Sequence, residues 1–128
     1  MPNIRQRVTL PAKPHDVFEA FMDSKKHSKF TGGPAKISRA VGGKFSVFGG
    51  YATGETRELV KDKKIVQTWR AEDFPAKHVS KITLTLKRVP GGTLVSFFHS
   101  NVPAKTVKGI TQGWKTYYWE PMKKMFGA

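Results

Sequence analysis

Two carboxylates near the middle of the chain, Glu55 and Glu58, are the first candidates for acid–base chemistry. They stand three positions apart on a predicted strand, where successive side chains point to opposite faces. We therefore expect them to point away from each other, so that they cannot work as a paired acid and base. Two interpretations stay open for each residue: a solvated position on the sheet, or an inward carboxylate paired with Arg70, which would mark a site.

The four histidines, His15, His27, His78 and His99, are the candidates for metal binding and proton transfer. None forms the i, i+4 pair of a helical zinc site, and no carboxylate-rich triad lies nearby in the sequence, so we predict no metal. His99 has two open interpretations. It lies either at the mouth of a cavity, or at the end of a strand with a water molecule or a backbone group as its partner.

Other motifs of catalysis are missing from the sequence. The glycine doublets match neither nucleotide-binding pattern, G-x-G-x-x-G or G-x-x-x-x-G-K-[ST], and there is no G-x-S-x-G nucleophile elbow. The chain contains no cysteine, which excludes a disulfide scaffold, a cysteine metal site and a thiol nucleophile. We predict no catalytic residue, no cofactor and no enzymatic activity.

Positive charge dominates the surface chemistry. The chain has 23 Lys and Arg against 9 Asp and Glu, a formal net charge of +14 at pH 7. The longest basic runs are pairs, and such dispersed charge is typical of a solvated surface that attracts acidic partners; a specific polyanion site is the alternative. No apolar run approaches the roughly 18 residues of a membrane span, and the start shows no signal peptide. We expect a cytoplasmic protein with no membrane span and without a nucleic-acid partner.

The elements that position these residues follow from the hydrophobic periodicity. Residues 3–10 alternate as a half-buried strand, in which Gln6 is the only polar inward position. Pro14 opens a short helix, and residues 24–30 add a second helical turn. Glycine doublets and charged turns then separate six more strands, which we predict at residues 35–41, 44–48, 52–60, 64–71, 77–88 and 93–101. Consecutive hairpins of this kind predict an antiparallel meander.

The last segment changes its period again. Apolar residues recur at three and four positions from Val107 to Phe126, which predicts one long C-terminal helix. We expect Pro121 to kink this helix near Tyr117. Gly109 and Gly113 share one face, and we expect them to let the helix approach another backbone closely. Residues 1–128 are predicted to form a single domain.

Four segments carry a resemblance to a known family. They are residues 42–51 (GGKFSVFGGY), the pair Gly54-Glu55, residues 65–70 (IVQTWR) and residues 112–118 (QGWKTYY). Together with the order of elements, they resemble the C-terminal domain of the activators of the Hsp90 ATPase, within the START-like (SRPBCC) superfamily. The resemblance implies an α+β helix-grip fold, with a curved antiparallel sheet of six to seven strands around a long C-terminal helix.

The same resemblance implies two functions. The first is a non-enzymatic binding protein that docks its basic surface on an acidic protein partner, such as an Hsp90-type chaperone. The second is a carrier or sensor of a small apolar molecule, because relatives in the superfamily hold such ligands between the sheet and the long helix. The residues expected to bind the ligand are aromatic, and each is open to a plainer interpretation as core; they are Phe48, Trp69, Phe97, Trp114 and Tyr118.

A third hypothesis is an enzyme in which Glu55 or His99 is the general acid or base. Nothing in the spacing of these residues supports it.

Overall fold

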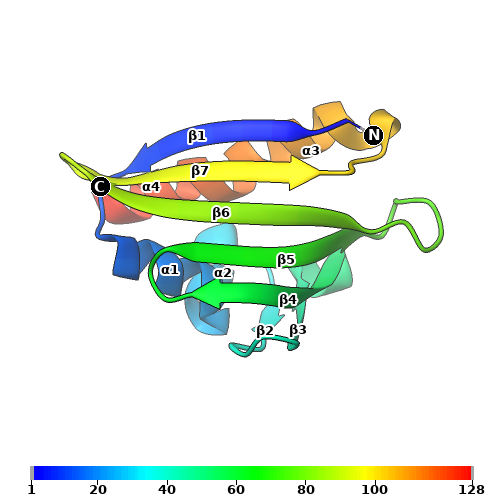
Figure 1. Cartoon of the computed structure of the whole chain (residues 1–128), viewed down its shortest axis with the longest axis horizontal. Coiled ribbons are helices and arrows are strands. Elements are labelled where there is room, and N and C mark those ends of the chain that lie inside the picture. The colour runs from blue at the N-terminus through cyan, green and yellow to red at the C-terminus, as the bar shows by residue number, and fades with distance from the viewer. Residues whose placement is uncertain (1, 128) are drawn as a thin grey trace.

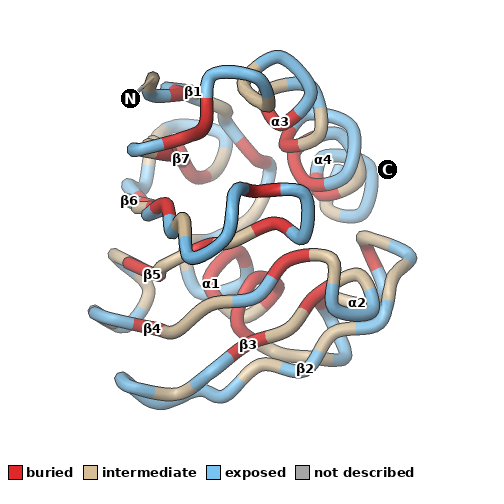
Figure 2. Tube along the Cα trace, turned by 90° about the vertical axis from the view of Figure 1, so that its right-hand side faces the viewer, coloured by how far each residue is buried: buried red, intermediate tan, exposed pale blue. Residues whose placement is uncertain are grey.

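The computed structural model describes residues 2–127 as two layers, an antiparallel sheet and the helices that cover one of its faces (Figures 1 and 2). The sheet has seven strands in the order β1-β7-β6-β5-β4-β3-β2. Their bounds are Ile4–Leu10 for β1, Ala35–Ile37 for β2, Lys44–Val47 for β3, Ala52–Val60 for β4, Lys64–Ala71 for β5, Ser80–Val89 for β6 and Gly92–Ser100 for β7. The predicted α+β helix-grip fold is confirmed.

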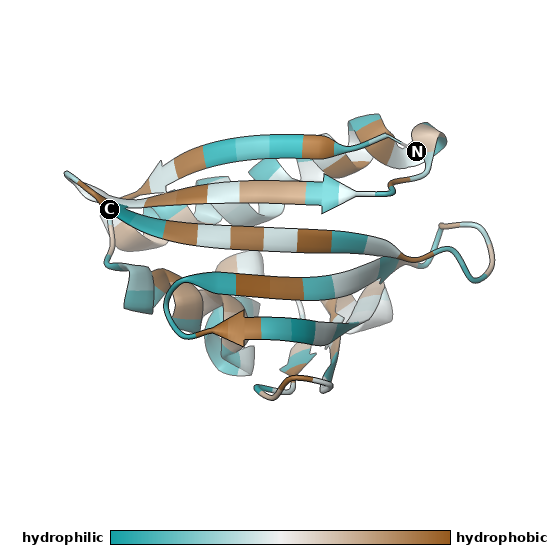
Figure 3. Ribbon diagram, viewed as in Figure 1, coloured by the Kyte–Doolittle hydropathy of each residue, from teal (hydrophilic) through white to brown (hydrophobic). Residues whose placement is uncertain are grey.

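Side chains alternate between the two faces of the sheet, as the bands of hydropathy along β6 show (Figure 3). In β6, Ile82 and Leu84 are buried under the helices, and Thr83 between them faces away from the core. β1 joins the sheet from the start of the chain by pairing with β7, with Ile4 opposite His99. The inner face of the sheet therefore supplies the core, and no described helix lies over the outer face, which is turned toward the viewer in Figure 1.

The connection between β5 and β6 departs from the prediction. The sixth strand was expected from residue 77, but it begins at Ser80. The residues before it form a loop that the Arg70 guanidinium holds in place, because it donates to the carbonyls of Pro75 at 2.6 Å, His78 at 2.9 Å and Phe74 at 3.2 Å. Arg70 therefore organises a loop. The interpretation in which it pairs with an inward Glu55 or Glu58 is wrong.

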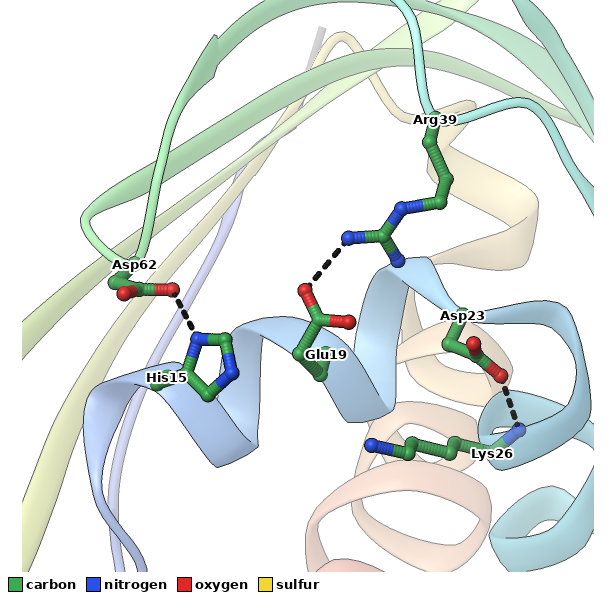
Figure 4. A network of polar contacts seen from close by, with 6 residues as sticks. All are labelled: His15, Glu19, Asp23, Lys26, Arg39 and Asp62. Carbon is green, nitrogen blue, oxygen red and sulfur yellow. Dashed lines mark hydrogen bonds and ion pairs between the residues drawn. The ribbon is translucent and has the colours of Figure 1, made fainter.

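Two short helices, α1 (Pro14–Met22) and α2 (Ser24–Thr31), cover part of the inner face. Pro14 occupies the first turn of α1, as predicted, and the Asp23 carboxylate caps α2 by accepting from the Lys26 backbone N–H at 3.0 Å. Figure 4 shows how polar contacts fix α1 to its surroundings: His15 meets Asp62 in the β4–β5 turn, and Glu19 meets Arg39 in the loop after β2.

The C-terminal helix runs through four consecutive segments. They are a 3-10 turn at Ala104–Thr106, α3 (Val107–Trp114), a π-helical stretch at Lys115–Trp119 and α4 (Glu120–Gly127). Near Tyr117, where we expected Pro121 to kink the helix, the structure has this π-helical stretch, whose backbone bond joins the Glu120 N–H to the Lys115 carbonyl. Within residues 2–127, no helix is both long and apolar enough to cross a membrane.

Candidate functional site

A cavity of about 90 Å³ lies between the C-terminal helix and the sheet. Its walls come from the turn between β3 and β4, from β5, and from one face of α3 and the π-helical stretch. The lining residues are Phe48, Tyr51, Trp69, Gly109, Ile110, Gly113, Trp114, Tyr117 and Tyr118. Because this lining is almost entirely aromatic or aliphatic, the cavity suits an apolar ligand.

The turn between β3 and β4 aims Phe48 at the helix. Phe48 has a φ of 53°, and Gly49 and Gly50 follow with φ values of 66° and 99°. A left-handed conformation costs a residue with a side chain about 1–2 kcal/mol. The Phe48 ring makes edge contacts with Tyr117 and Tyr118, at centroid distances of 5.7 and 6.0 Å, which offset part of that cost. The turn therefore closes one wall of the cavity.

The two glycines of α3 do not serve the close backbone contact that we expected, and this expectation was wrong. A Cβ atom placed on Gly109 meets nothing within 4 Å, and one placed on Gly113 meets only the Tyr117 ring, at 4.0 Å. Both glycines line the cavity instead. The missing side chains leave room for the cavity on this face of the helix.

A chain of hydrogen bonds behind the cavity fixes Trp114. The Trp114 Nε1–H donates to Nδ1 of His99 at 3.1 Å, Nε2 of His99 lies 2.7 Å from the Ser80 Oγ, and the Ser80 hydroxyl donates to the Trp69 carbonyl at 2.5 Å. Since His99 Nδ1 accepts and the Ser80 proton is used by Trp69, the Nε2 of His99 carries the proton. The ring is therefore neutral, with both nitrogens satisfied.

His99 stands next to the end of β7 (Gly92–Ser100), as one interpretation of its sequence position proposed, and it does not line the cavity, so the other interpretation is wrong. It is fully buried, and its hydrogen-bond partners are the side chains of Ser80 and Trp114 in place of a backbone group. Burial lowers the pKa of His99 to about 3, because the charged ring would lose its hydration without gaining a carboxylate partner. The structure gives His99 the role of orienting Trp114.

A second buried histidine, His27 of α2, fixes Tyr118 in the same way. Its Nδ1 lies 2.9 Å from the Phe21 carbonyl, and its Nε2 lies 2.9 Å from the Tyr118 hydroxyl. The carbonyl can only accept, so Nδ1 donates to it and Nε2 accepts from the tyrosine. Burial lowers the pKa of His27 and raises that of Tyr118. The inward position of His27 was missed, although its spacing of three from Phe30 on α2 indicated it.

Trp119 is a third anchored ring, and the sequence analysis did not single it out. Its Nε1–H donates to Oε1 of Gln6 at 2.6 Å, and Nε2 of Gln6 donates to the Thr111 carbonyl at 3.0 Å. The regular helical period from Trp114 selects Tyr117 or Tyr118 as the next inward residue. The π-helical stretch adds a residue to that turn, which brings both Tyr118 and Trp119 into the core.

Four of the five residues expected to bind a ligand meet at the cavity. Phe48, Trp69, Trp114 and Tyr118 all line it, and Trp69 and Trp114 lie 5.6 Å apart between ring centroids. Phe97 lies elsewhere, in the core between Trp114 and Trp119, at centroid distances of 4.5 and 5.3 Å. The spacing of strand and helix residues predicted which side chains face inward, but not which of them border empty space.

The two glutamates lie on the same face of the sheet, so the expectation that they diverge was wrong. The register of β4 against β5 shifts between Thr56 and Glu58, and a bulge of this kind resets the alternation of side chains. Glu55 lies 3.6 Å from Arg57, and Glu58 lies 3.5 Å from Lys64. Both carboxylates are on the solvated outer face, away from the cavity.

The described residues, 2–127, contain no evident metal site. No group of three or more His, Cys, Asp or Glu side chains there is placed to hold a metal ion. The buried polar groups of the site pair with one another instead. The arrangement offers an apolar cavity with a rigid wall of hydrogen-bonded aromatic rings.

Comparison with known proteins places most of the chain among one group of relatives. Residues 11–127 match the family described as Activator of Hsp90 ATPase homolog 1-like protein. Human activator of 90 kDa heat shock protein ATPase homolog 1 is 33% identical over 124 residues, which cover 97% of this chain and 37% of the human protein. A Dictyostelium discoideum homologue is 30% identical over 115 residues, 88% of this chain and 30% of the relative. The chain thus spans less than half the length of these relatives.

Solved structures agree with this grouping. The crystal structure of an HSP90 activator from Plasmodium falciparum has a TM-score of 0.92 and 26% identity, and the alignment covers 98% of this chain and 96% of that one. The solution structure of an Aha1 dimer from Colwellia psychrerythraea has a TM-score of 0.82 and 18% identity, with 100% of both chains covered. The second likeness shows the fold alone.

Proposed function

Because this chain belongs to the family of Activator of Hsp90 ATPase homolog 1-like proteins, we propose that it binds an Hsp90-type chaperone and stimulates its ATPase. The observation that carries the proposal is the near-complete superposition on the HSP90 activator from Plasmodium falciparum. That chain is matched over almost its whole length, whereas the human relative is matched over about a third. This likeness supports the proposal that a domain of this size is enough for the contact with the chaperone.

The mechanism would be stabilisation of one conformation of the chaperone. A ligand shifts a conformational equilibrium only by the difference between its affinities for the two states. The net charge of +14 would speed encounter with an acidic partner and make the binding sensitive to salt. The chain needs no catalytic residue or cofactor for this role, and it would act in the cytoplasm, where such a chaperone is met.

The test is the steady-state ATPase rate of a purified Hsp90-type chaperone titrated with this chain. We expect the rate to rise to a plateau, and the half-maximal concentration to increase steeply between 50 and 300 mM salt. An unrelated basic protein of similar size and charge is the control for non-specific attraction. A flat titration at 50 mM salt, with no complex seen by analytical ultracentrifugation, would contradict the proposal.

The cavity favours a second candidate function, the binding of a small apolar molecule. Its volume of about 90 Å³ is smaller than the engineered 150 Å³ cavity that accepts benzene. The ligand would therefore be very small, or would push Tyr117 outward. Contact would come from the four aromatic residues predicted above that line the cavity, Phe48, Trp69, Trp114 and Tyr118.

Native mass spectrometry of the purified chain tests this second function, with the denatured chain as the reference mass. An adduct lost on denaturation is expected, and it should be absent from Gly113→Leu, whose side chain enters the cavity. Lys108→Leu, an exposed change on the same helix, is the matched control and should keep the adduct. A bare wild-type chain that also fails to bind added xenon, a very small apolar probe, and added benzene would contradict the carrier function.

A further inference from the structure

The outer face of the sheet carries a cluster of unpaired positive charges around one aromatic ring. Arg5 and Arg7 of β1 and Lys81 and Lys87 of β6 are exposed, and we call these four residues the outer-face cluster. None of them takes part in an ion pair with another residue of the described range, 2–127. The cluster is therefore available to an outside partner.

The strand register fixes where these charges stand. Arg5 is opposite Phe98 and Arg7 is opposite Ser96, across β1 and β7. Their next neighbours on β6 are Thr83 and Thr85, and Lys81 and Lys87 lie one row beyond these on either side. From strand geometry, the two arginines are about 7 Å apart, and the two lysines about 20 Å apart. The four cations thus frame a flat area floored by hydroxyl groups and the Phe98 ring.

The Arg5 guanidinium is already oriented. It lies over the Phe98 ring, 4.3 Å from the centroid, and such a contact limits the freedom of the side chain before any partner arrives. Arginine presents a rigid fork that binds a carboxylate through two hydrogen bonds, and it loses little entropy in doing so. Arg5 and Arg7, two residues apart, match the spacing of alternate side chains on an extended strand.

The other basic surface of the molecule is less suited to a specific contact. It lies on the C-terminal helix, where Lys105, Lys108 and Lys115 are exposed. The charges there are all lysines, and lysine is depleted at protein interfaces whereas arginine is enriched. The exposed ring of this helix, Tyr117, packs edge-on against Phe48 at 5.7 Å, not against a cation. The helix therefore contributes general attraction, and the outer face has the composition of a binding surface.

We propose that the outer-face cluster is the docking surface of this protein and that it binds an extended acidic segment of a protein partner. Carboxylates at alternate positions of that segment would contact Arg5 and Arg7. Charge complementarity selects the acidic partner. A nucleic acid fits less well, because the Phe98 ring is the only aromatic ring among the outward side chains of β1, β6 and β7 and Arg5 already covers it. The proposal deepens the function proposed above, since it names the surface that would meet the chaperone.

Two triple variants with equal changes in net charge test the location. They are Arg5→Glu/Arg7→Glu/Lys81→Glu on the sheet and Lys105→Glu/Lys108→Glu/Lys115→Glu on the helix. We expect the sheet variant to bind an Hsp90-type chaperone about 30-fold more weakly, and the helix variant about 3-fold more weakly. Circular dichroism and the unfolding midpoint show that each variant is folded. A helix variant that loses as much as or more than the sheet variant would overturn the proposal and leave the proposed function standing.

A second probe separates this inference from the chaperone function. A short synthetic peptide of alternating glutamate and threonine is titrated into the nitrogen-15-labelled chain, and the amide shifts are mapped. Shifts confined to β1, β6 and β7 support the docking surface even if the chaperone does not bind, in which case only the proposed function fails. Shifts elsewhere, or none, overturn the surface.

The two arginines and the nature of the partner are tested separately. Arg5→Lys/Arg7→Lys keeps the charge but removes the forked donors, and we expect it to weaken peptide binding about 5-fold. Unchanged affinity would show that charge alone matters, and would overturn the role of the guanidinium forks. An oligothymidylate that shifts the same amides at lower concentration than the peptide, at equal salt, would overturn the acidic segment as the occupant in favour of a nucleic acid.

Discussion

The two flanks of the C-terminal helix differ in their residues and in how those residues are held. On one flank, Trp114, Tyr118 and Trp119 each form a hydrogen bond with a polar side chain of the sheet or of α2, namely buried His99, buried His27 and half-buried Gln6. On the other flank, Gly109 and Gly113 leave space, and Tyr117 is 53% exposed. A polar partner marks the rings that are held in place, and two of these, Trp114 and Tyr118, also border the cavity.

The difference implies that stability depends mainly on the hydrogen-bonded flank, two of whose rings, Trp114 and Tyr118, also line the cavity. Buried donors and acceptors that lose their partner cost about 1–3 kcal/mol each, so the hydrogen-bonded flank tolerates little change. The glycine flank has no such contacts to lose. The helix can therefore be altered on one flank without unfolding the protein, and the predictions below follow that contrast from the largest expected effect to the smallest.

Truncation of Trp114 should have the largest effect. Trp114→Ala removes a 3% exposed ring that packs on Trp69 and Phe97 and leaves His99 without its donor. We expect the free energy of unfolding to fall by about 3–5 kcal/mol, measured by urea denaturation. The matched change on the other flank, Tyr117→Ala, should cost less than about 1 kcal/mol. Equal losses would remove the contrast between the flanks.

Acid should weaken the hydrogen-bonded flank through His99. Its pKa is about 3 in the folded protein because of burial, whereas an unfolded histidine titrates near 6.5. Between these values the unfolded chain binds the extra proton, so stability is complete above about pH 6.5 and falls as the pH drops toward 3. From this residue alone we expect a loss of about 2 kcal/mol between pH 6.5 and 5.

The variant His99→Gln isolates that contribution. Its unfolding free energy, measured by urea denaturation at several pH values, should depend less steeply on pH than that of the wild type. The control is Ser96→Ala, a change without a titratable group on the outer face of β7, which should leave the wild-type slope in place. If His99→Gln keeps the full slope, protonation of His99 does not drive the acid sensitivity.

Removal of the Ser80 hydroxyl tests the hydrogen-bond chain without a large change in volume. Ser80→Ala leaves the His99 Nε2–H and the Trp69 carbonyl without their partner. We expect a loss of about 1–3 kcal/mol by thermal or urea unfolding. Ser96→Ala, on the outer face of β7, should change stability by no more than about 0.5 kcal/mol. If Ser80→Ala left the free energy of unfolding unchanged, the hydrogen bonds from Ser80 through His99 would orient Trp114 without stabilising the fold.

Alanine substitutions in the glycine flank should have the smallest effect, and of the opposite sign. The sites of Gly109→Ala and Gly113→Ala have space for the methyl group, and alanine favours a helix over glycine by about 1 kcal/mol. We expect each variant to be up to about 1 kcal/mol more stable and the cavity to be smaller. Destabilisation of both variants would show that the cavity is collapsed in solution.

The sequence predicted the fold well because the fold follows periodicity. The alternation in β1, the hairpin turns and the three-and-four spacing of the last segment each correspond to an element of the structure. The same reasoning failed where one extra residue enters an element. The bulge in β4 placed Glu55 and Glu58 on one face, and the π-helical stretch turned Trp119 inward.

The candidate site was predicted less completely, for a related reason. Periodicity shows that Trp69, Phe97 and Trp114 face inward, but a cavity arises where side chains are absent, and its position depends on how the helix lies against the sheet. Likewise, the partners of His27 and His99 come from distant parts of the sequence. Whether the aromatic residues bind a ligand, and whether residues 1–128 form one domain, stay predictions.

The pairing of β1 with β7 constrains how the protein is made. Ile4 finds its partner His99 only when most of the chain has been synthesised, and contacts this distant in sequence slow folding. Until then β1 has an unpaired, half-apolar edge that favours aggregation. Its outward arginines, Arg5 and Arg7, keep that edge charged until β7 has been synthesised and pairs with it. Charged side chains on an exposed edge oppose pairing with other chains, so we expect Arg5 and Arg7 to act before folding is complete as well as after it.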